Sequence, residues 1–192
     1  MLFRSFALAV VVSFLISLLH DKTVDLADGF FNRRLDRVEH ELGEAVRRAR
    51  SPAEIEHILA DDVFHALKLT SAATFRLQGS TLSRDGNGKG WDNCEQALRS
   101  DHPILAPLTG SVPFKMKRSY SAGIDFPKGF AHPVLAVPAV NPARCFAVSL
   151  YGSHATGTDF DHNERAMLAR LSSDAAAIYA ELENRELREK IA

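Results

Sequence analysis

The stretch FAVSLYGSHATGTDFDHNERAMLARLSSDAAAIYAELEN, residues Phe146–Asn184, decides the fold of this chain of 192 residues. An apolar run opens it, a glycine-containing loop follows, and apolar residues then recur at every third or fourth position. The apolar run predicts a buried strand, and the later recurrence predicts an amphipathic helix. Asp161 and Glu164 have the spacing of a capping box, which predicts that Asp161 caps this helix. Its expected buried stripe consists of Met167, Leu168, Leu171, Ala175, Ile178 and Leu182.

The strand that opens this stretch is predicted to be the second half of a hairpin. The apolar runs His132–Val140 and Ala143–Gly152 bracket Asn141 and Pro142, which read as the turn between two strands. Because the runs are almost continuously apolar, both strands are expected to be buried on part of both faces. Pro138 has no backbone N–H to donate, which predicts an edge position or a bulge in the first strand.

An earlier hairpin is predicted nearer the N-terminus. Ser71–Gln78 alternates apolar and polar residues, Gly79 supplies the turn, and Thr81–Gly90 is a short polar partner strand that ends in a glycine-rich loop.

The segment between the two hairpins is predicted to be mostly irregular. Cys94–Arg99 has the composition of a turn or two of helix. Asp101–Pro113 contains three prolines, which forbid a long regular element there. Phe114–Arg118 is then predicted to be an edge strand.

Two helices are predicted to precede all the strands. Asn32–Ala49 carries apolar residues on one stripe and Arg and Glu on the rest of its surface. Ser51–Glu54 combines a capping serine, a proline at the first helical position and a glutamate at the third, so a second helix starts there and ends near Lys68. Strands gathered between flanking helices predict an α+β fold, an antiparallel sheet backed by helices on one face.

Three stretches together resemble a GAF domain. Phe146–Asn184 is similar to the closing strand, loop and helix of that family, Ser71–Trp91 to its first hairpin, and Leu135–Val148 to its central hairpin. The resemblance covers roughly Arg37–Glu183. Ser17–Leu42 is also similar to the juxtamembrane stretch that joins a membrane region to a GAF domain in some bacterial sensor proteins.

The resemblance implies a signalling module that binds a small molecule, senses redox state or serves as a dimerisation scaffold. It identifies no cofactor or ligand. The residues associated with cyclic-nucleotide-binding members are not recognisable, and no cysteine adjoins a histidine as in members that attach tetrapyrroles. The resemblance also leaves two alternatives open, a thiol-dependent enzyme similar to methionine sulfoxide reductases of this family and a degenerate scaffold that binds nothing.

The N-terminus is predicted to be a membrane anchor. Phe6–Leu19 holds fourteen residues without a charge, close to the lower limit for a transmembrane helix. A cleaved signal peptide and a buried core helix are the alternatives, although no small-x-small cleavage site follows the run. The basic residues after the run outnumber Arg4 before it, which predicts that the later residues lie in the cytoplasm. The resemblance to bacterial sensor proteins implies that the anchor lies in the inner membrane of a bacterial cell.

The expected organisation has four parts. A transmembrane helix occupies residues 1–20, a juxtamembrane connector residues 21–36, a GAF-like domain residues 37–183 and a helical extension residues 184–192. The extension has too little apolar surface to fold alone. Both flanking helices have apolar stripes, and the resemblance implies that these helices pack together in a parallel homodimer that couples the anchor to an output.

Composition and motifs argue against other classes of function. With 23 basic and 24 acidic side chains, the chain has no basic footprint for nucleic acid. Cys94 and Cys145 have neither the spacing of a zinc site nor that of a disulfide framework. The eight histidines form no metal-ligand motif, and DGNGKG, Asp85–Gly90, is not a phosphate-binding loop because no helix opens after it. The sequence therefore predicts no metal and no catalytic activity.

Residues around the irregular segment are the candidates for a ligand pocket between the sheet and its loops. Such pockets are apolar with a few polar groups. The alternative is that the aromatic residues are simply buried in the core, as large aromatic residues usually are. The pocket candidates are Trp91, Phe114, Arg118, Tyr120, Asp125 and Phe126.

Overall fold

The computed structural model describes residues 33–86, 88–94, 96–98, 102, 104, 112–117, 120, 125–142 and 144–191. The chain divides into two units, Met1–Arg37 and Val38–Ala192. The predicted transmembrane helix and most of the predicted connector lie outside the described residues. Within the part of the chain that is described, no helix is both long and apolar enough to cross a membrane.

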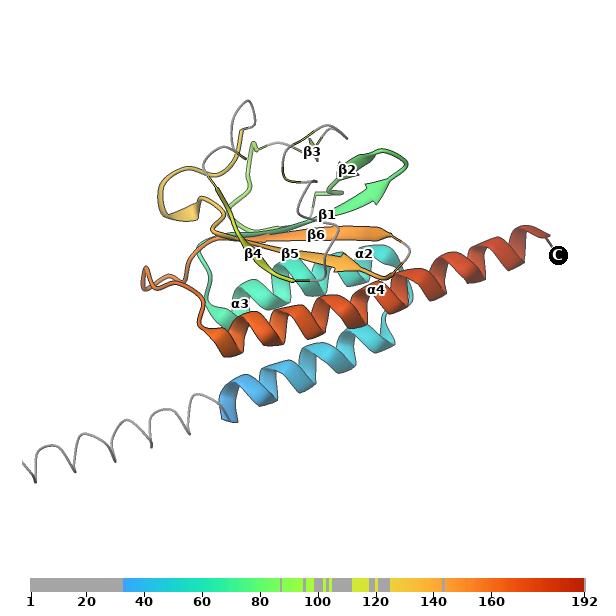
Figure 1. Ribbon diagram of the computed structural model, residues 1–192, viewed down its shortest axis with the longest axis horizontal. Helices are drawn as coiled ribbons and strands as arrows, with labels where there is room; N and C mark the ends of the chain where they lie inside the picture. The colour runs from blue at the N-terminus through green and yellow to red at the C-terminus, as the bar shows by residue number, and fades with distance from the viewer. Residues whose placement is uncertain are drawn as a thin grey trace, which may run out of the picture. The chain divides into compact units, whose positions relative to one another are not determined.

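Six strands form one antiparallel sheet (Figure 1). Their order across the sheet is β3-β2-β1-β6-β5-β4. Both predicted hairpins are confirmed, as β1–β2 and β5–β6. The strands are β1 Ala72–Gln78, β2 Thr81–Ser83, β3 Ala97–Leu98, β4 Phe114–Lys115, β5 Leu135–Val140 and β6 Cys145–Tyr151.

Pro138 lies in β5, which is not an edge strand. β4 pairs only with Leu135 and Ala136, so Pro138 lies beyond the last residue of β5 that β4 pairs with. The pairing with β6 shifts its register between Ala139 and Val140. None of the described strands therefore pairs with β5 at Pro138 on that side, which confirms a local edge position for this residue. A bulge is also present nearby, but its extra residue, Phe146, lies in β6.

The prediction for Cys94–Arg99 is wrong, because part of this segment is a strand. Leu98 pairs with Leu82 and Ala97 with Ser83, so β3 extends the sheet beyond β2. The unpaired backbone groups of β2 supply the partners that a strand needs. The edge strand predicted at Phe114–Arg118 is confirmed as the shorter β4.

The second predicted helix is one helical run of three parts. These are α2 Pro52–His57, the π-helical turn η1 Ile58–Asp62 and α3 Val63–Leu67, with Lys68 in the left-handed conformation (φ 53°) at the end. Ser51 Oγ accepts from the Glu54 N–H as predicted, but the Glu54 carboxylate accepts from Arg50 N. Inside the π-turn, the Leu59 carbonyl accepts a hydrogen bond of 2.8 Å from the buried Tyr151 hydroxyl.

Figure 1 shows α2, α3 and α4 (His162–Ile191) together on one face of the sheet, as predicted. Five residues of the predicted stripe on α4 are buried, whereas Ile178 is only half-buried. Tyr179 is buried in its place and stacks on Phe146 with ring centroids 5.9 Å apart. Phe146 is the residue that the register shift leaves without a partner in β5. Tyr179 therefore packs on the part of β6 where the pairing with β5 is irregular.

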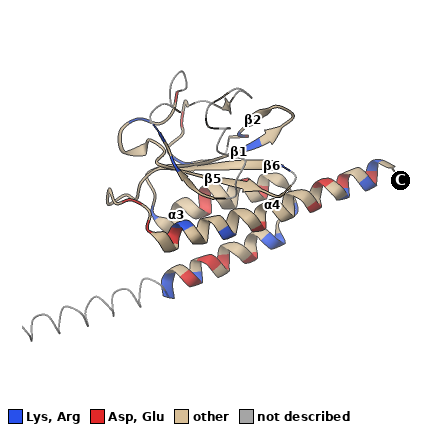
Figure 2. Ribbon diagram, in the orientation of Figure 1, with Lys and Arg blue, Asp and Glu red and all other residues tan. Residues whose placement is uncertain are grey.

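The first described helix, residues 33–48, has charged contacts with α4. Arg170 donates to both carboxylate oxygens of Glu39 at 2.5 and 2.7 Å, and this contact lowers the pKa of Glu39. Arg47 pairs with Asp174 at 2.7 Å, and Arg185 donates to the Arg50 carbonyl. Figure 2 shows the charges concentrated on the helices, while β5 and β6 carry none. These pairs are largely exposed and each adds little stability, whereas Leu42 and Val46 of the same helix are buried.

A buried carboxylate ties the start of α4 to the rest of the domain. Glu164, 2% exposed, accepts from Asp161 N at 3.0 Å, and Asp161 Oδ1 accepts from Glu164 N at 2.7 Å, which confirms the predicted capping box. Glu164 Oε2 also lies 3.0 Å from His154 Nε2. The other ring nitrogen of His154 donates to the Leu67 carbonyl at 2.9 Å. The end of α3, the loop after β6 and the start of α4 are thereby joined.

We expect the Glu164→Ala variant to lose about 2–3 kcal/mol of unfolding free energy, because one cap and one buried partner of His154 disappear together. Urea unfolding followed by circular dichroism measures the change. Glu186→Ala is the matched control, since Glu186 is exposed on the same helix and its loss should change stability by less than about 0.5 kcal/mol. Equal losses in both variants would contradict the role of Glu164.

Candidate functional site

The face of the sheet away from the helices carries a cluster of aromatic rings. The side chains of Phe75 and Val148 point to this face, whereas Arg76 and Tyr151 contact α2 and η1 on the other. We call the aromatic cluster the rings of Phe75, Trp91, His102, Phe126 and His132.

Trp91 lies at the centre of the aromatic cluster. Its ring meets Phe75 at 5.4 Å and Phe126 at 5.5 Å, both edge to face. Phe126 in turn contacts His102 at 6.5 Å and His132 at 6.3 Å. Trp91 is only 1% exposed, and none of the described residues accepts a hydrogen bond from its Nε1–H. A buried indole N–H usually has a partner, so this donor marks a position where a polar acceptor would be stabilised.

Arg84 places a buried positive charge beside Trp91. Its Nη2 donates to the carbonyl oxygens of Trp91 at 2.9 Å and of Cys94 at 3.3 Å, and its guanidinium lies 5.7 Å from the Trp91 ring. Burial lowers the pKa of Arg84, while the neighbouring Cys94 and Asp92 act in the opposite direction. The side chain therefore holds the turn of residues 91–94 against the sheet and makes this region electropositive.

Close backbone approach brings the glycine-rich loop across β1. Lys89 pairs with Ala72 through two hydrogen bonds of 3.0 and 2.8 Å. A Cβ at Gly88, where φ is +106°, would lie 2.6 Å from the Ala72 carbonyl oxygen. Only glycine fits at this position. Trp91 follows two residues after Lys89, so the pairing of Lys89 with β1 also fixes where Trp91 lies.

The structure brings together some of the six predicted pocket residues. Trp91 and Phe126 meet in the aromatic cluster, and Phe114 lies against the same core and meets Tyr120 edge to face at 6.2 Å. Asp125 is exposed and has a long pair of 3.8 Å with Lys128. Arg118 lies outside the described residues. A ligand-binding role for these six residues stays a prediction.

Arg84, His102 and Phe75 were not among the predicted site residues. Phe75 belongs to an alternating strand, whose pattern shows that one face is buried but not what that face meets. Arg84 sits in a polar stretch and His102 in a proline-rich one, so no local pattern distinguishes them from exposed residues. Only the folding of distant segments over β1 brings Arg84 and Phe75 to Trp91 and His102 to Phe126.

Both thiols favour their protonated forms. Burial raises the pKa of Cys145 to about 11, and a contact of its Sγ with the Ala147 backbone at 3.4 Å opposes this effect only in part. Burial also raises the pKa of Cys94, with Asp125 adding to the effect. Reactive cysteines have a lowered pKa, so these environments are the opposite of what thiol catalysis requires. Among the described residues, no group of three His, Cys, Asp or Glu side chains is arranged to hold a metal ion.

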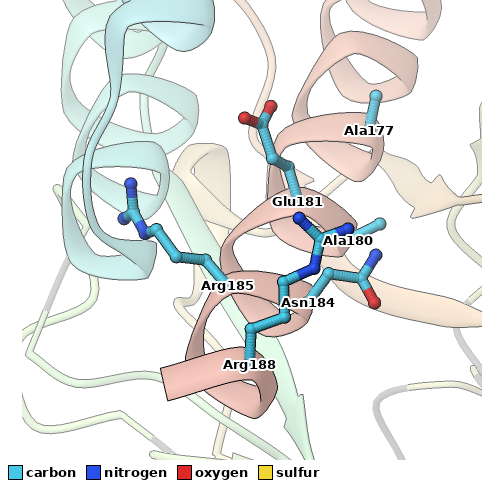
Figure 3. A pocket seen from close by; sticks show the side chains of 6 residues that line it. All are labelled: Ala177, Ala180, Glu181, Asn184, Arg185 and Arg188. Atoms are coloured by element: carbon cyan, nitrogen blue, oxygen red, sulfur yellow. The ribbon is translucent and has the colours of Figure 1, made fainter. Parts of the chain in front are cut away.

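A hollow on the surface of α4 is a second feature with a distinct shape. It has a volume of about 420 Å³ and is lined by residues of α4. Figure 3 shows Ala177, Ala180 and Asn184 along one side of the helix, while Arg185 extends to the other side. Its remaining lining residues are Glu181 and Arg188. The hollow is open and charged, and it lies on the helix side of the sheet, away from the aromatic cluster.

Comparison with known proteins finds similar folds but no similar sequence. No family model and no curated protein matches the chain. The GAF domain of a phosphoenolpyruvate-protein phosphotransferase from Coxiella burnetii has a TM-score of 0.64 at 11% identity, over 81% of this chain and 98% of that one. The corresponding Acinetobacter domain has a TM-score of 0.60 at 14% identity, over 81% and 95%. Free methionine-R-sulfoxide reductase from Neisseria meningitidis, in complex with its substrate, has a TM-score of 0.57 at 11% identity, over 79% and 91%.

The raised pKa of Cys145 predicts slow alkylation. At pH 8, only about one thiol in a thousand is ionised when the pKa is about 11, so iodoacetamide should react slowly with the Cys94→Ser variant. The rate should rise steeply between pH 9 and pH 11. Mass spectrometry measures the rate, and the same variant in urea is the control, where the thiol recovers an ordinary pKa of about 8.5. Fast modification of the folded protein at pH 7 would contradict this environment and favour thiol chemistry.

Proposed function

Since the chain has the GAF fold, we propose that it is a membrane-anchored sensory or regulatory module that binds a small molecule and has no catalytic activity of its own. The fold agrees with the resemblance of the sequence to that family. In this proposal, the ligand binds on the loop face of the sheet, the flanking helices form a homodimer, and the domain lies on the cytoplasmic side of a bacterial inner membrane.

The observation that carries the proposal is the unpartnered indole N–H of the buried Trp91 within the described residues. A ligand with a planar or apolar group would pack against the rings around Trp91 and accept a hydrogen bond from Nε1. The positive Arg84 alongside favours an acceptor that carries partial or full negative charge. Both features suit a small organic molecule with an oxygen acceptor better than a cation.

A thiol-dependent enzyme is the second candidate, because one of the similar folds is a methionine sulfoxide reductase. The protonated environments of Cys94 and Cys145 weigh against it. Assay of free methionine-(R)-sulfoxide reduction, with the Cys94→Ser and Cys145→Ser variants as controls, separates the two candidates. Turnover that disappears in either variant would replace the sensory proposal.

A ligand screen tests the first candidate. Amino acids, nucleotides and small carboxylic acids should include a compound that raises the melting temperature by about 5 °C or more at a hundredfold excess over Kd. Trp91 is the single tryptophan, so the same compound should change the intrinsic fluorescence.

The Trp91→Phe variant keeps an aromatic ring but loses the N–H, and it should lose most of the thermal shift. Phe130→Ala is the matched control, since Phe130 is exposed and outside the aromatic cluster, and it should keep the shift. An unchanged shift in Trp91→Phe would move the ligand away from this site. A broad screen without any stabilising compound would favour a scaffold that binds nothing.

Membrane anchoring has a separate test in the full chain. The protein should remain in the membrane pellet after alkaline carbonate extraction, with its N-terminal residues present by mass spectrometry. Val12→Arg should lower the membrane fraction, because arginine at the centre of a span costs about 2.5–3.5 kcal/mol, whereas Val12→Leu should not. A cleaved N-terminus would support a signal peptide, and complete extraction would support a soluble helix.

A further inference from the structure

The last part of α4 has a second stripe that faces away from the sheet. The residues Ala177, Ala180, Asn184, Leu187 and Ile191 recur with spacings of three, four, three and four. We call these five residues the α4 seam. Such spacing places them on one line along the helix, in the a and d positions of a heptad repeat. The hollow of Figure 3 lies on this line, where Ala177 and Ala180 provide little side-chain volume.

The α4 seam is exposed along the part of α4 that leaves the domain. Leu187 is 55% exposed and Ile191 is 85% exposed, although both are large apolar residues. In Figure 1, the C-terminal end of α4 extends beyond the strands of the sheet. Buried residues of α4 end at Leu182, so none of the described residues buries this end of the seam.

The α4 seam is distinct from the stripe that packs inside the domain. Asn184 follows the buried Ala175 by nine residues, which is about two and a half helical turns, so the two side chains point in opposite directions. Leu182 is 5% exposed and faces inward. The sequence predicted a dimer interface through the apolar stripe of α4, but the buried Leu182 is not available for such an interface. The α4 seam is the apolar stripe of this helix that stays exposed.

We infer that the α4 seam packs against the α4 seam of a second copy of this chain, as a parallel, in-register, two-stranded coiled coil. This inference specifies the interface of the dimer in the proposed function and rests on that dimer. The seam repeats over two heptads, and the domain already holds α4 in helical form up to Leu182, so the second copy does not have to nucleate the helix.

Asn184 identifies the second copy as the partner. It occupies an a position, where asparagine pairs with the same residue of the other helix in parallel dimers. An apolar partner would leave its amide without hydrogen bonds, which disfavours other occupants of the same face. In a parallel in-register pair, the two Asn184 amides meet and fix the register.

The charges beside the α4 seam fit this arrangement. Glu183 occupies a g position and Arg188 the following e position, and g and e' residues of parallel helices are neighbours across the interface. Glu183 of each copy would therefore face Arg188 of the other. Arg188 is exposed, and Glu183 pairs with Arg144 within its own domain. The two chains would thus be linked through Glu183 to Arg144, the residue that precedes β6.

Cysteine crosslinking of the full chain in intact cells tests the inference, in a background with Cys94→Ser and Cys145→Ser. Asn184→Cys and Leu187→Cys should each form a disulfide-linked homodimer on oxidation. Glu186→Cys and Glu189→Cys are the matched controls, since they are exposed on the same turns but away from the α4 seam, and should not crosslink.

A charge exchange tests the register independently. Arg188→Glu should reduce crosslinking at Leu187→Cys, and addition of Glu183→Arg should restore it, while thermal unfolding of the domain confirms that each variant folds. Failure of restoration would overturn the parallel register.

The remaining outcomes separate this inference from the proposed function. Ala45→Cys, in the helix of residues 33–48, is a further position to test. Crosslinks at the control positions, or only at Ala45→Cys, would overturn the α4 seam but leave the dimer. A monomer without crosslinks at any position would overturn both the α4 seam and the proposed dimer. It would not affect the proposed ligand binding, which the thermal-shift screen tests separately. Protection of Leu187→Cys from alkylation without a homodimer would show that another partner or the N-terminal segment covers this face.

Discussion

The carboxylate of Glu164 is the contact on which the helical layer depends. One buried oxygen accepts from Asp161 N and faces His154, whose other ring nitrogen reaches the last turn of α3. A buried carboxylate is stable only when its oxygens have hydrogen-bond partners. The end of α3, the loop after β6 and the start of α4 must therefore lie together in the folded domain. Because α4 starts from this point and runs for 30 residues, its direction determines where the C-terminal end of the helix leaves the domain.

The sheet separates two environments with different chemistry. On the helix face, Arg76 pairs with the buried Glu56 at 2.7 Å, and Tyr151 reaches into the π-turn. On the loop face, aromatic rings and Arg84 surround Trp91. β6 contributes side chains to both faces and pairs with β1 and β5. β6 therefore contacts both the aromatic layer and α4.

Prediction from sequence succeeded where the deciding forces are local. The capping box at Asp161, the two hairpins and the helix that starts at Pro52 follow from turn chemistry and apolar periodicity. Prediction failed where a distant segment decides. β3 pairs with the open edge of β2, and Tyr179 is buried against Phe146 of β6 whereas Ile178 is only half-buried. Of the six predicted pocket residues, Trp91 and Phe126 lie in contact, whereas Arg84 carries no local signal, and a ligand-binding role stays a prediction.

The sequence by itself determined the α+β class, the order of most elements and the place where α4 begins, because periodicity, caps and turns act between residues a few positions apart. Only the tertiary structure decided which residues surround Trp91 and which stripe of α4 stays exposed. Both depend on contacts between segments far apart in the chain. Arg84, for example, donates a hydrogen bond to the Trp91 carbonyl after the glycine-rich loop, and Leu182 of α4 is buried in the domain. Two stripes on one helix look alike in sequence, and the packing of the sheet against one of them is what distinguishes them.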